Sequence, residues 1–132
     1  MDNRLLSDRF PRSNKYHPAW LIAGCSGGAN PVWLTEWLTS KLDLRPGMRV
    51  LDLGCGRALS SIFLRREFEV EVWAVDLWFS ASENLKRIRD AGVENHVYPI
   101  HAEARHYRSR MTSSMPSLRS TPSHILAPMI TT

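Results

Sequence analysis

The sequence is poor in cysteine and has no long apolar run. Its 132 residues contain two cysteines, Cys25 and Cys55. Two are too few for a disulfide framework or a cysteine-based metal cluster. No uninterrupted hydrophobic stretch approaches the ~20 residues that a membrane-spanning helix needs. The residues after Met1 contain no signal-type apolar core. We therefore expect a cytoplasmic protein with no bound metal and no transmembrane segment.

Acidic residues are missing from the C-terminal segment, residues 106–132. This segment holds Arg108, Arg110 and Arg119, and without them the 17 basic residues fall to 14, against 13 acidic ones. The net charge of +4 therefore lies mostly in one segment that lacks the interleaved aromatics of nucleic-acid modules, so we expect no nucleic-acid partner. The segment is rich in Ser, Thr and Pro and has no glycine, which predicts a disordered tail.

Helix and strand patterns alternate between residues 31 and 105. This order predicts an α/β fold with a parallel sheet and right-handed crossovers. Pro99 places the third strand at an edge of that sheet. The predicted strands are residues 50–53, 70–75 and 97–100; the predicted helices run from Asn30 to about Leu42, across Leu59, Ile62 and Phe63, and from a Ser80 cap to Gly92.

The chain divides into three segments on these patterns. Residues 1–30 form an N-terminal arm and entry segment, and residues 31–105 form a partial Rossmann-like domain. Residues 106–132 form the tail. Residues 1–16 are polar and irregular, which predicts a loose arm with at most a short helical turn.

A glycine turn, Asp52-Leu53-Gly54-Cys55-Gly56, follows the first predicted strand. In doubly wound folds, ligands bind over the carboxyl ends of the strands, and glycine lets a ligand approach the backbone. A dinucleotide site would need a third glycine where Leu59 stands. Asp52 also repels phosphate and suits a cationic or amino-bearing ligand. A nicotinamide-dependent dehydrogenase is therefore disfavoured.

Asp76 ends the second predicted strand, about twenty residues after the turn. A carboxylate at this place can accept hydrogen bonds from both hydroxyls of a ribose. The simpler interpretation is an ordinary glycine turn and an acid that precedes a helix. The two features together, at the ends of neighbouring strands, favour a nucleoside-type ligand.

The stretch Arg49-Val50-Leu51-Asp52-Leu53-Gly54-Cys55-Gly56 resembles motif I of class I SAM-dependent methyltransferases. The resemblance covers about residues 28–105. It implies a Rossmann-like methyltransferase fold of which only strands 1–3 with their helices are present, and S-adenosylmethionine (SAM) as cofactor. The Trp-rich entry helix and residues 101–105 resemble type 11 or cyclopropane-synthase-like members, which implies a small-molecule or lipid-like methyl acceptor.

The resemblance also implies a set of cofactor-binding residues but no catalytic residue. Leu77 and Trp78 would flank adenine, although core packing is the alternative for both. Glu103 stands where many members have an Asp that accepts the adenine amino group. The implied cofactor-binding residues are Asp52, Gly54, Cys55, Gly56, Asp76, Leu77, Trp78 and Glu103.

The family pattern stops at Arg105, where members continue with a Leu-Pro-Phe turn and a fourth strand. When residues 106–132 are translated from the third base of each codon, a consistent codon choice gives LPFADDFFDAIVAIDSFTYFGTNDNY, which restores that pattern. Some positions in it are forced, among them Asp from Met111-Thr112, Ala from Met115-Pro116 and Asp from Met129-Ile130. We therefore predict a C-terminal truncation by a frameshift after Arg105. A natural low-complexity tail is the alternative.

A truncated fold would have an incomplete sheet. In the family, strand 1 pairs with strand 4, so the first strand here would become an open apolar edge and promote self-association. Methyltransferase activity would then be impaired. The alternative function is a non-catalytic fragment that binds a nucleotide-type ligand weakly or associates through this edge.

Overall fold

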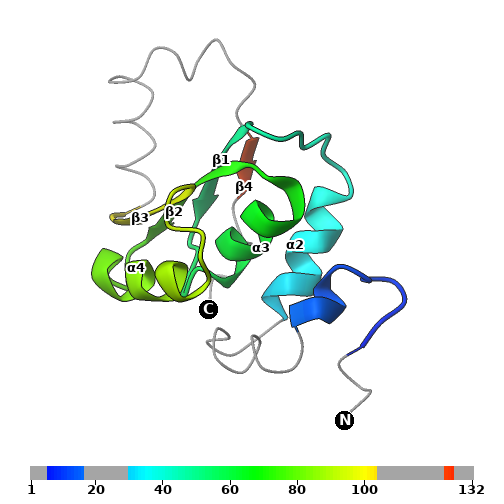
Figure 1. The fold of residues 1–132 in the computed structure, drawn as a ribbon, viewed down its shortest axis with the longest axis horizontal. Helices are drawn as coiled ribbons and strands as arrows, with labels where there is room; N and C mark the ends of the chain where they lie inside the picture. The colour runs from blue at the N-terminus through cyan, green and yellow to red at the C-terminus, as the bar shows by residue number, and fades with distance from the viewer. Residues whose placement is uncertain (1–5, 17–29, 104–123, 127–132) are drawn as a thin grey trace.

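The computed structural model describes residues 6–16, 30–103 and 124–126 (Figure 1). Helices and strands alternate through the central part of the chain, as the sequence predicts. The elements are η2 (Ser13–Tyr16), α2 (Pro31–Thr39), β1 (Arg49–Leu53), α3 (Leu59–Phe68), β2 (Glu71–Asp76), α4 (Ala81–Asp90), β3 (Val97–His101) and β4 (His124–Leu126).

The strands form one parallel sheet in the order β3-β2-β1-β4. β1 pairs with β2 up to Leu53 and Val75, and β2 pairs with β3 up to Asp76 and His101. The three predicted strands and the edge position of the strand that contains Pro99 are confirmed. Because the strands are parallel, the carboxyl ends of β1, β2 and β3 lie at one edge of the sheet.

A fourth strand changes the prediction for the edge of β1. β4 pairs in parallel with β1, with His124 opposite Val50 and Leu126 opposite Asp52. The expectation of an open β1 edge is therefore wrong over this stretch, while the predicted strands 1–3 with their helices are present. Unpaired N–H and C=O groups on an edge are a template for any available extended segment, and β4 pairs with them. The predicted disordered tail otherwise lies outside the described residues.

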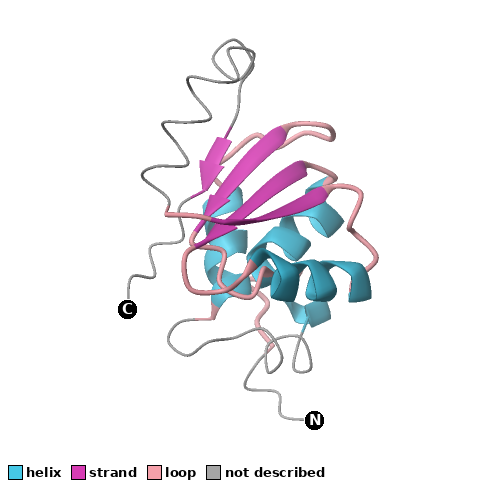
Figure 2. Ribbon diagram, turned by 90° about the vertical axis from the view of Figure 1, so that its left-hand side faces the viewer, coloured by secondary structure: helices cyan, strands magenta, loops and turns pink. Residues whose placement is uncertain are grey.

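The three α-helices lie on one side of the sheet (Figure 2). Alternate strand residues point toward them, as expected for the two-residue period of a strand. The main core joins Val50, Val72 and Val97 of the sheet to Ile62 of α3 and Ile88 of α4. The other face of the sheet carries a smaller apolar cluster of Leu51, Val75, Leu53, Trp73, Ile100 and Ala102.

The helix starts follow the capping signals in the sequence. The Asn30 side chain accepts hydrogen bonds from the second and third residues of α2, and Pro31 occupies the first helical position. α2 ends at Thr39, three residues before the predicted end. Ser80 and Glu83 form a reciprocal capping box at the start of α4.

Both ends of α3 lie in the left-handed backbone region without a glycine. Ala58, before the helix, has φ of 63°, and Glu69, after it, has φ of 56°. A non-glycine residue in this conformation costs about 1 kcal/mol relative to an unstrained one. Ala58 is fully buried, whereas Glu69 is exposed, so the strain at Glu69 can be relieved without disturbing the core.

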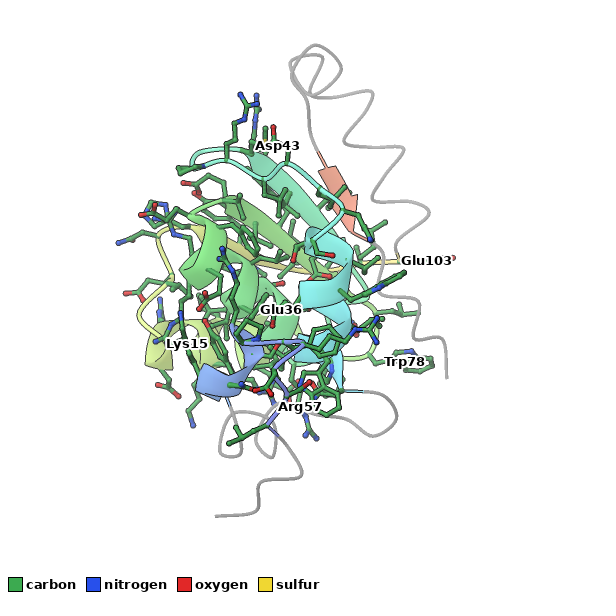
Figure 3. All side chains as sticks on the ribbon, turned by 90° about the vertical axis from the view of Figure 1, so that its right-hand side faces the viewer. Lys15, Glu36, Asp43, Arg57, Trp78 and Glu103 are labelled. Atoms are coloured by element: carbon green, nitrogen blue, oxygen red, sulfur yellow. The ribbon has the colours of Figure 1, made fainter. Side chains whose placement is uncertain are left out.

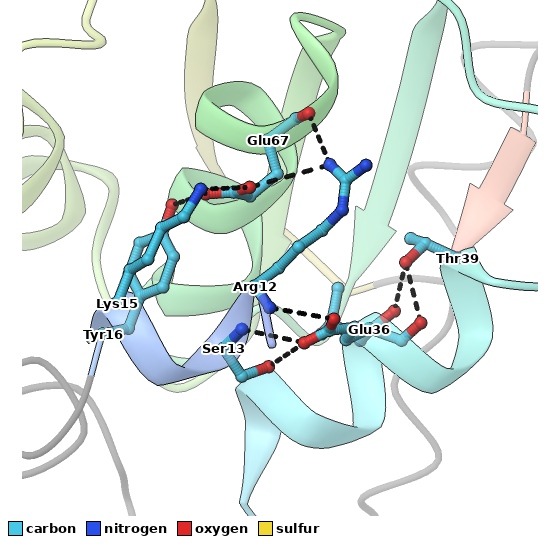
Figure 4. A network of polar contacts seen from close by, with 8 residues as sticks. Arg12, Ser13, Lys15, Tyr16, Glu36, Thr39 and Glu67 are labelled. Atoms are coloured by element: carbon cyan, nitrogen blue, oxygen red, sulfur yellow. Dashed lines mark hydrogen bonds and ion pairs between the residues drawn. The ribbon is translucent and has the colours of Figure 1, made fainter. Parts of the chain in front are cut away.

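The described part of the N-terminal arm is docked on the helices, so the prediction of a loose arm is wrong for residues 6–16. The Glu36 carboxylate of α2 accepts hydrogen bonds from the backbone N–H groups of Arg12 (3.1 Å) and Ser13 (2.8 Å). The Ser13 hydroxyl donates a third hydrogen bond, of 2.6 Å, to the same carboxylate (Figure 4). These bonds fix the start of η2 against α2.

A second carboxylate, Glu67 of α3, holds the other end of η2. It accepts a hydrogen bond from the Tyr16 hydroxyl (2.9 Å) and pairs with Lys15 (3.2 Å), as Figure 4 shows. The Tyr16 ring is 3% exposed and packs edge-on against Phe63. Burial, followed by the contact with Glu67, raises the pKa of Tyr16, so the phenol stays protonated. The arm is thereby fastened to two helices.

Candidate functional site

The glycine turn after β1 is hydrogen-bonded to the end of β2. The Gly56 N–H donates to Oδ2 of Asp76 at 2.8 Å. The N–H groups of Gly54 and Cys55 donate to the Val75 carbonyl at 2.7 and 3.1 Å. Gly54 and Gly56 have φ of 74° and 58°, which glycine adopts at little cost. The turn and the acid that the sequence singled out are therefore in direct contact.

Main-chain N–H groups orient the Asp76 carboxylate. Besides the Gly56 bond to Oδ2, Oδ1 accepts from the N–H groups of Trp78 (2.7 Å) and Phe79 (3.0 Å). The residue is 6% exposed. A carboxylate has about four acceptor positions, so these three bonds leave about one position on Oδ2. The bonds hold that position at the carboxyl edge of the sheet.

Asp52 lies inside the fold, one strand away from Asp76. It is 1% exposed, and its Oδ2 accepts hydrogen bonds from the hydroxyls of Ser60 (2.6 Å) and Ser61 (2.7 Å) in the first turn of α3. Burial raises the pKa of Asp52 and the charge of Asp76 adds to this, while the two hydroxyls oppose it. Its side chain thus ties β1 to α3, and a direct contact with a cofactor stays a prediction.

The Cys55 side chain is buried beneath the turn. Burial raises the pKa of its thiol, and the charges of Asp52 and Asp76 raise it further, so the sulfur stays protonated. A protonated, buried thiol is a poor nucleophile. Cys55 can therefore reach a ligand in the turn through its backbone only.

Leu77 and Trp78 project from the loop after β2 as large apolar side chains. Trp78 is 86% exposed and Leu77 about half exposed, so the core-packing interpretation is wrong for both. Figure 3 shows the Trp78 side chain extending away from the ribbon. The exposed Glu103 follows β3, at the same edge of the sheet. Apolar surface and a carboxylate thus lie at the carboxyl edge of the sheet.

Two residues that are not among the predicted cofactor-binding residues also position this edge. His101 Nε2 donates to the Leu77 carbonyl at 2.7 Å, which ties the end of β3 to the loop after β2. Asn84 of α4 donates to the Gly56 carbonyl at 2.9 Å. A signal for Asn84 exists in the sequence, because it lies one helical turn before Ile88 and so occupies the apolar face of α4.

The site offers hydrogen-bond acceptors and apolar surface. Within residues 6–16, 30–103 and 124–126, no group of three or more His, Cys, Asp or Glu gathers as a metal site. None of the helices in these ranges is long and apolar enough to cross a membrane. Asp52 and Asp76 make the turn electrostatically unfavourable for phosphate. A ligand with hydroxyl donors and a planar ring fits better.

Comparisons with known proteins found a similarity over a short stretch of sequence and a similarity of fold. No protein-family model matches the chain. Phosphoethanolamine N-methyltransferase 3 of Arabidopsis thaliana is 40% identical over 43 residues, which are 33% of this chain and 9% of that protein.

Two solved structures share the fold. A SAM-dependent methyltransferase from Geobacter sulfurreducens, in complex with S-adenosyl-L-homocysteine, has a TM-score of 0.51 and 26% identity over 64% of this chain and 35% of its own. The protein YjhP from E. coli has a TM-score of 0.51 and 25% identity over 64% of this chain and 36% of its own. The chain thus spans about a third of the length of either solved structure.

Proposed function

We propose that this chain, which has the Rossmann-like fold of the N-terminal part of SAM-dependent methyltransferases, binds SAM at the carboxyl ends of β1 and β2. The observation that carries the proposal is the 2.8 Å hydrogen bond from the Gly56 N–H to Asp76. It brings together a glycine turn and an acid from neighbouring parallel strands, the place where doubly wound folds bind nucleosides.

The residues at this edge fit the chemical groups of SAM. The remaining acceptor position on Asp76 Oδ2 suits a ribose hydroxyl, and the exposed Leu77 and Trp78 offer apolar surface to adenine. Gly54 and Gly56 carry no side chain that would keep a ligand from the backbone. Glu103 can accept a hydrogen bond from the adenine amino group.

The proposed reaction is methyl transfer to a small-molecule or lipid-like acceptor. Bound SAM supplies a sulfonium whose methyl carbon is electrophilic. The residues of this chain would hold the ribose and the adenine in one orientation, and such positioning lowers the barrier by removing rotational and translational freedom before reaction. Among the described residues we assign none as a catalytic base. The plant relative named for phosphoethanolamine supports a small acceptor.

Calorimetric titration with S-adenosylhomocysteine and with SAM tests the binding proposal. We expect saturable binding by the full chain, and Asp76→Ala should abolish it because the ribose acceptor is removed. Asp43→Ala, at an exposed residue paired with Arg45, is the matched control and should bind like wild type. Absence of saturable binding by the wild-type chain at millimolar ligand would contradict the proposal.

A cofactor-binding fragment without catalysis is the second candidate. This candidate is favoured because the chain spans only about a third of the length of the two solved structures named above. A chain of this kind would bind S-adenosylhomocysteine but transfer no methyl group. The residues of β1 that do not pair with β4 would leave part of its edge open and would promote self-association. Methyl transfer to a panel of amines and phospholipids, with gel filtration of the same sample, separates the two candidates.

The frameshift after Arg105 is a separate proposal about the gene. If it is correct, the DNA after the Arg105 codon encodes the Leu-Pro-Phe pattern in another frame, and inserting one base there gives a longer chain. We expect that chain to bind S-adenosylhomocysteine more tightly than the 132-residue chain. A downstream sequence without the family pattern in any frame would refute it.

A further inference from the structure

Asn84 is a polar residue in the apolar core. It lies on α4 and is 2% exposed, one helical turn before the fully buried Ile88. Burying an amide without partners costs several kcal/mol, about 2 or more. Hydrogen bonds to the glycine turn and to Arg87 offset this cost. The residue is therefore held by specific contacts and not by apolar packing alone.

The partners of Asn84 fix the orientation of its amide group. Nδ2 lies 2.9 Å from the Gly56 carbonyl oxygen, which can only accept. Oδ1 lies 2.9 Å from Nη1 of Arg87, which can only donate. A flipped amide would place a donor against a donor and an acceptor against an acceptor. Only one orientation of the amide satisfies both partners.

The main chain of Gly56 is thus held on both sides. Its N–H donates to Asp76 at 2.8 Å, and its carbonyl accepts from Asn84 at 2.9 Å. Because glycine has wide conformational freedom, external hydrogen bonds must select the one conformation that reaches Asp76. Loss of the Asn84 bond would let the turn move and would weaken the Gly56 bond to Asp76.

We propose that Asn84 is a positioning residue that holds Gly56, and through it the Asp76 carboxylate, in the conformation that receives the ribose of the cofactor. The inference rests on the proposed function. It predicts that a change at Asn84 alters the affinity for any ligand that contains the ribose. A purely structural Asn84 would alter the stability of the fold and leave the affinity of the folded chain unchanged.

The test compares variants of the full chain by calorimetry with S-adenosylhomocysteine and with adenosine, alongside thermal unfolding. Asn84→Leu removes the amide but keeps its bulk, and we expect affinity for both ligands to fall by about 3- to 10-fold, the effect of one hydrogen bond. Ile88→Val, on the same face of α4, is the matched control: it should lower the unfolding temperature and leave both affinities unchanged.

Asn84→Asp tests the positioning role through the pH dependence of ligand affinity, which a purely structural role of Asn84 would not change. Its ionised carboxyl would face the Gly56 carbonyl as acceptor against acceptor, so affinity should fall further than in Asn84→Leu. As pH is lowered, the carboxyl protonates and can donate to Gly56 again. The ratio of wild-type to variant affinity should therefore narrow toward acidic pH.

The outcomes separate the inference from the proposed function. Failure of the wild-type chain to bind either ligand overturns both. Binding by the wild type, with unchanged affinity in Asn84→Leu and a lower unfolding temperature, overturns only the positioning role. If Asn84→Leu does not fold, Arg87→Met decides: it removes the donor that orients the amide, and a loss of about 2-fold or more supports the role, whereas none overturns it.

Discussion

The anchor of the N-terminal arm at Glu36 and the glycine turn at Asp76 are built in similar ways. Each carboxylate accepts three hydrogen bonds, and most of the donors are main-chain N–H groups. Glu36 takes the N–H groups of Arg12 and Ser13 and the Ser13 hydroxyl. Asp76 takes three N–H groups from the glycine turn and from the loop that follows β2.

The two regions differ in what surrounds the carboxylate. The buried Glu36 side chain extends from α2 toward η2 (Figure 4), and its three donors come from one short segment. Asp76 lies at the carboxyl edge of the sheet, beside the exposed Trp78, and its donors come from two segments. In the first region, three hydrogen bonds to a carboxylate hold two packed segments together. In the second region, three such bonds orient a carboxylate at the carboxyl edge of the sheet, where a ligand can reach it. Changes at Glu36 should therefore affect stability, and changes at Asp76 should affect ligand affinity.

The largest effect is expected at the anchor. Glu36→Ala leaves two N–H groups and one hydroxyl without their acceptor in a buried place, so the free energy of unfolding should fall by about 2–3 kcal/mol. Urea denaturation measures it. Glu94→Ala, at an exposed loop residue, should change it by less than about 0.5 kcal/mol. If folded Glu36→Ala also bound S-adenosylhomocysteine more weakly than wild type, the predicted difference between the two regions would be wrong.

The next effect is expected at the turn. Asp76→Asn keeps the size of the side chain but replaces one acceptor oxygen with an NH₂ donor. Because both carboxylate oxygens accept from main-chain N–H groups, this NH₂ faces an N–H donor in either orientation of the amide. We expect the affinity for S-adenosylhomocysteine to fall by about 10- to 100-fold, measured by calorimetry. Asp90→Asn, at the exposed end of α4, is the control. Unchanged affinity would remove Asp76 from the site.

The pH dependence of stability should depend on Asp52. Its pKa is raised in the folded state by burial, so between the unfolded pKa of about 4 and the raised value the folded chain binds more protons than the unfolded one. Stability from this residue is therefore lost as pH rises, by up to about 1.4 kcal/mol per pH unit. Asp52→Asn should remove that slope in denaturation curves recorded across pH, whereas Asp43→Asn should retain it.

The smallest effect is expected outside both regions. Glu69→Gly relieves the left-handed backbone after α3 and keeps the main-chain bonds of that residue to Arg65 and Gly47. The free energy of unfolding should rise by about 0.5–1 kcal/mol. Glu69→Ala cannot relieve the strain and should show no such gain. Equal stability of the two variants would contradict the backbone explanation.

Much of the sheet and part of the site could be predicted from the sequence. Strand runs alternating with capped helices determine a parallel sheet, and the spacing of the glycine turn and Asp76 places both at the ends of neighbouring strands. The sequence leaves two interpretations open for Trp78, and its exposure argues against core packing, while contact with a cofactor stays a prediction. These signals lie within a few residues of one another, or they are hydrophobic periodicities that a single helix or strand is long enough to show.

The parts that were not predicted depend on contacts between distant segments. Glu36 of α2 accepts a hydrogen bond from Ser13 of η2, which lies 23 residues earlier in the chain. The polar composition of the N-terminal arm does not indicate that a buried carboxylate binds it. The role of Asn84 depends on the approach of α4 to the turn. β4 is a three-residue strand within a segment that has no period, so only its pairing with β1 reveals it.

The position of β1 in the middle of the sheet has a consequence for the order of folding. Val50 pairs with Val72 on one side and with His124 on the other, much farther along the chain. Closing the longer loop costs about 1 kcal/mol more conformational entropy than closing the shorter one. The helices and strands from β1 to β3 can thus form a nucleus from contacts near in sequence while the chain is still being synthesised. The β4 side of β1 stays exposed to other nascent chains until residues 124–126 leave the ribosome.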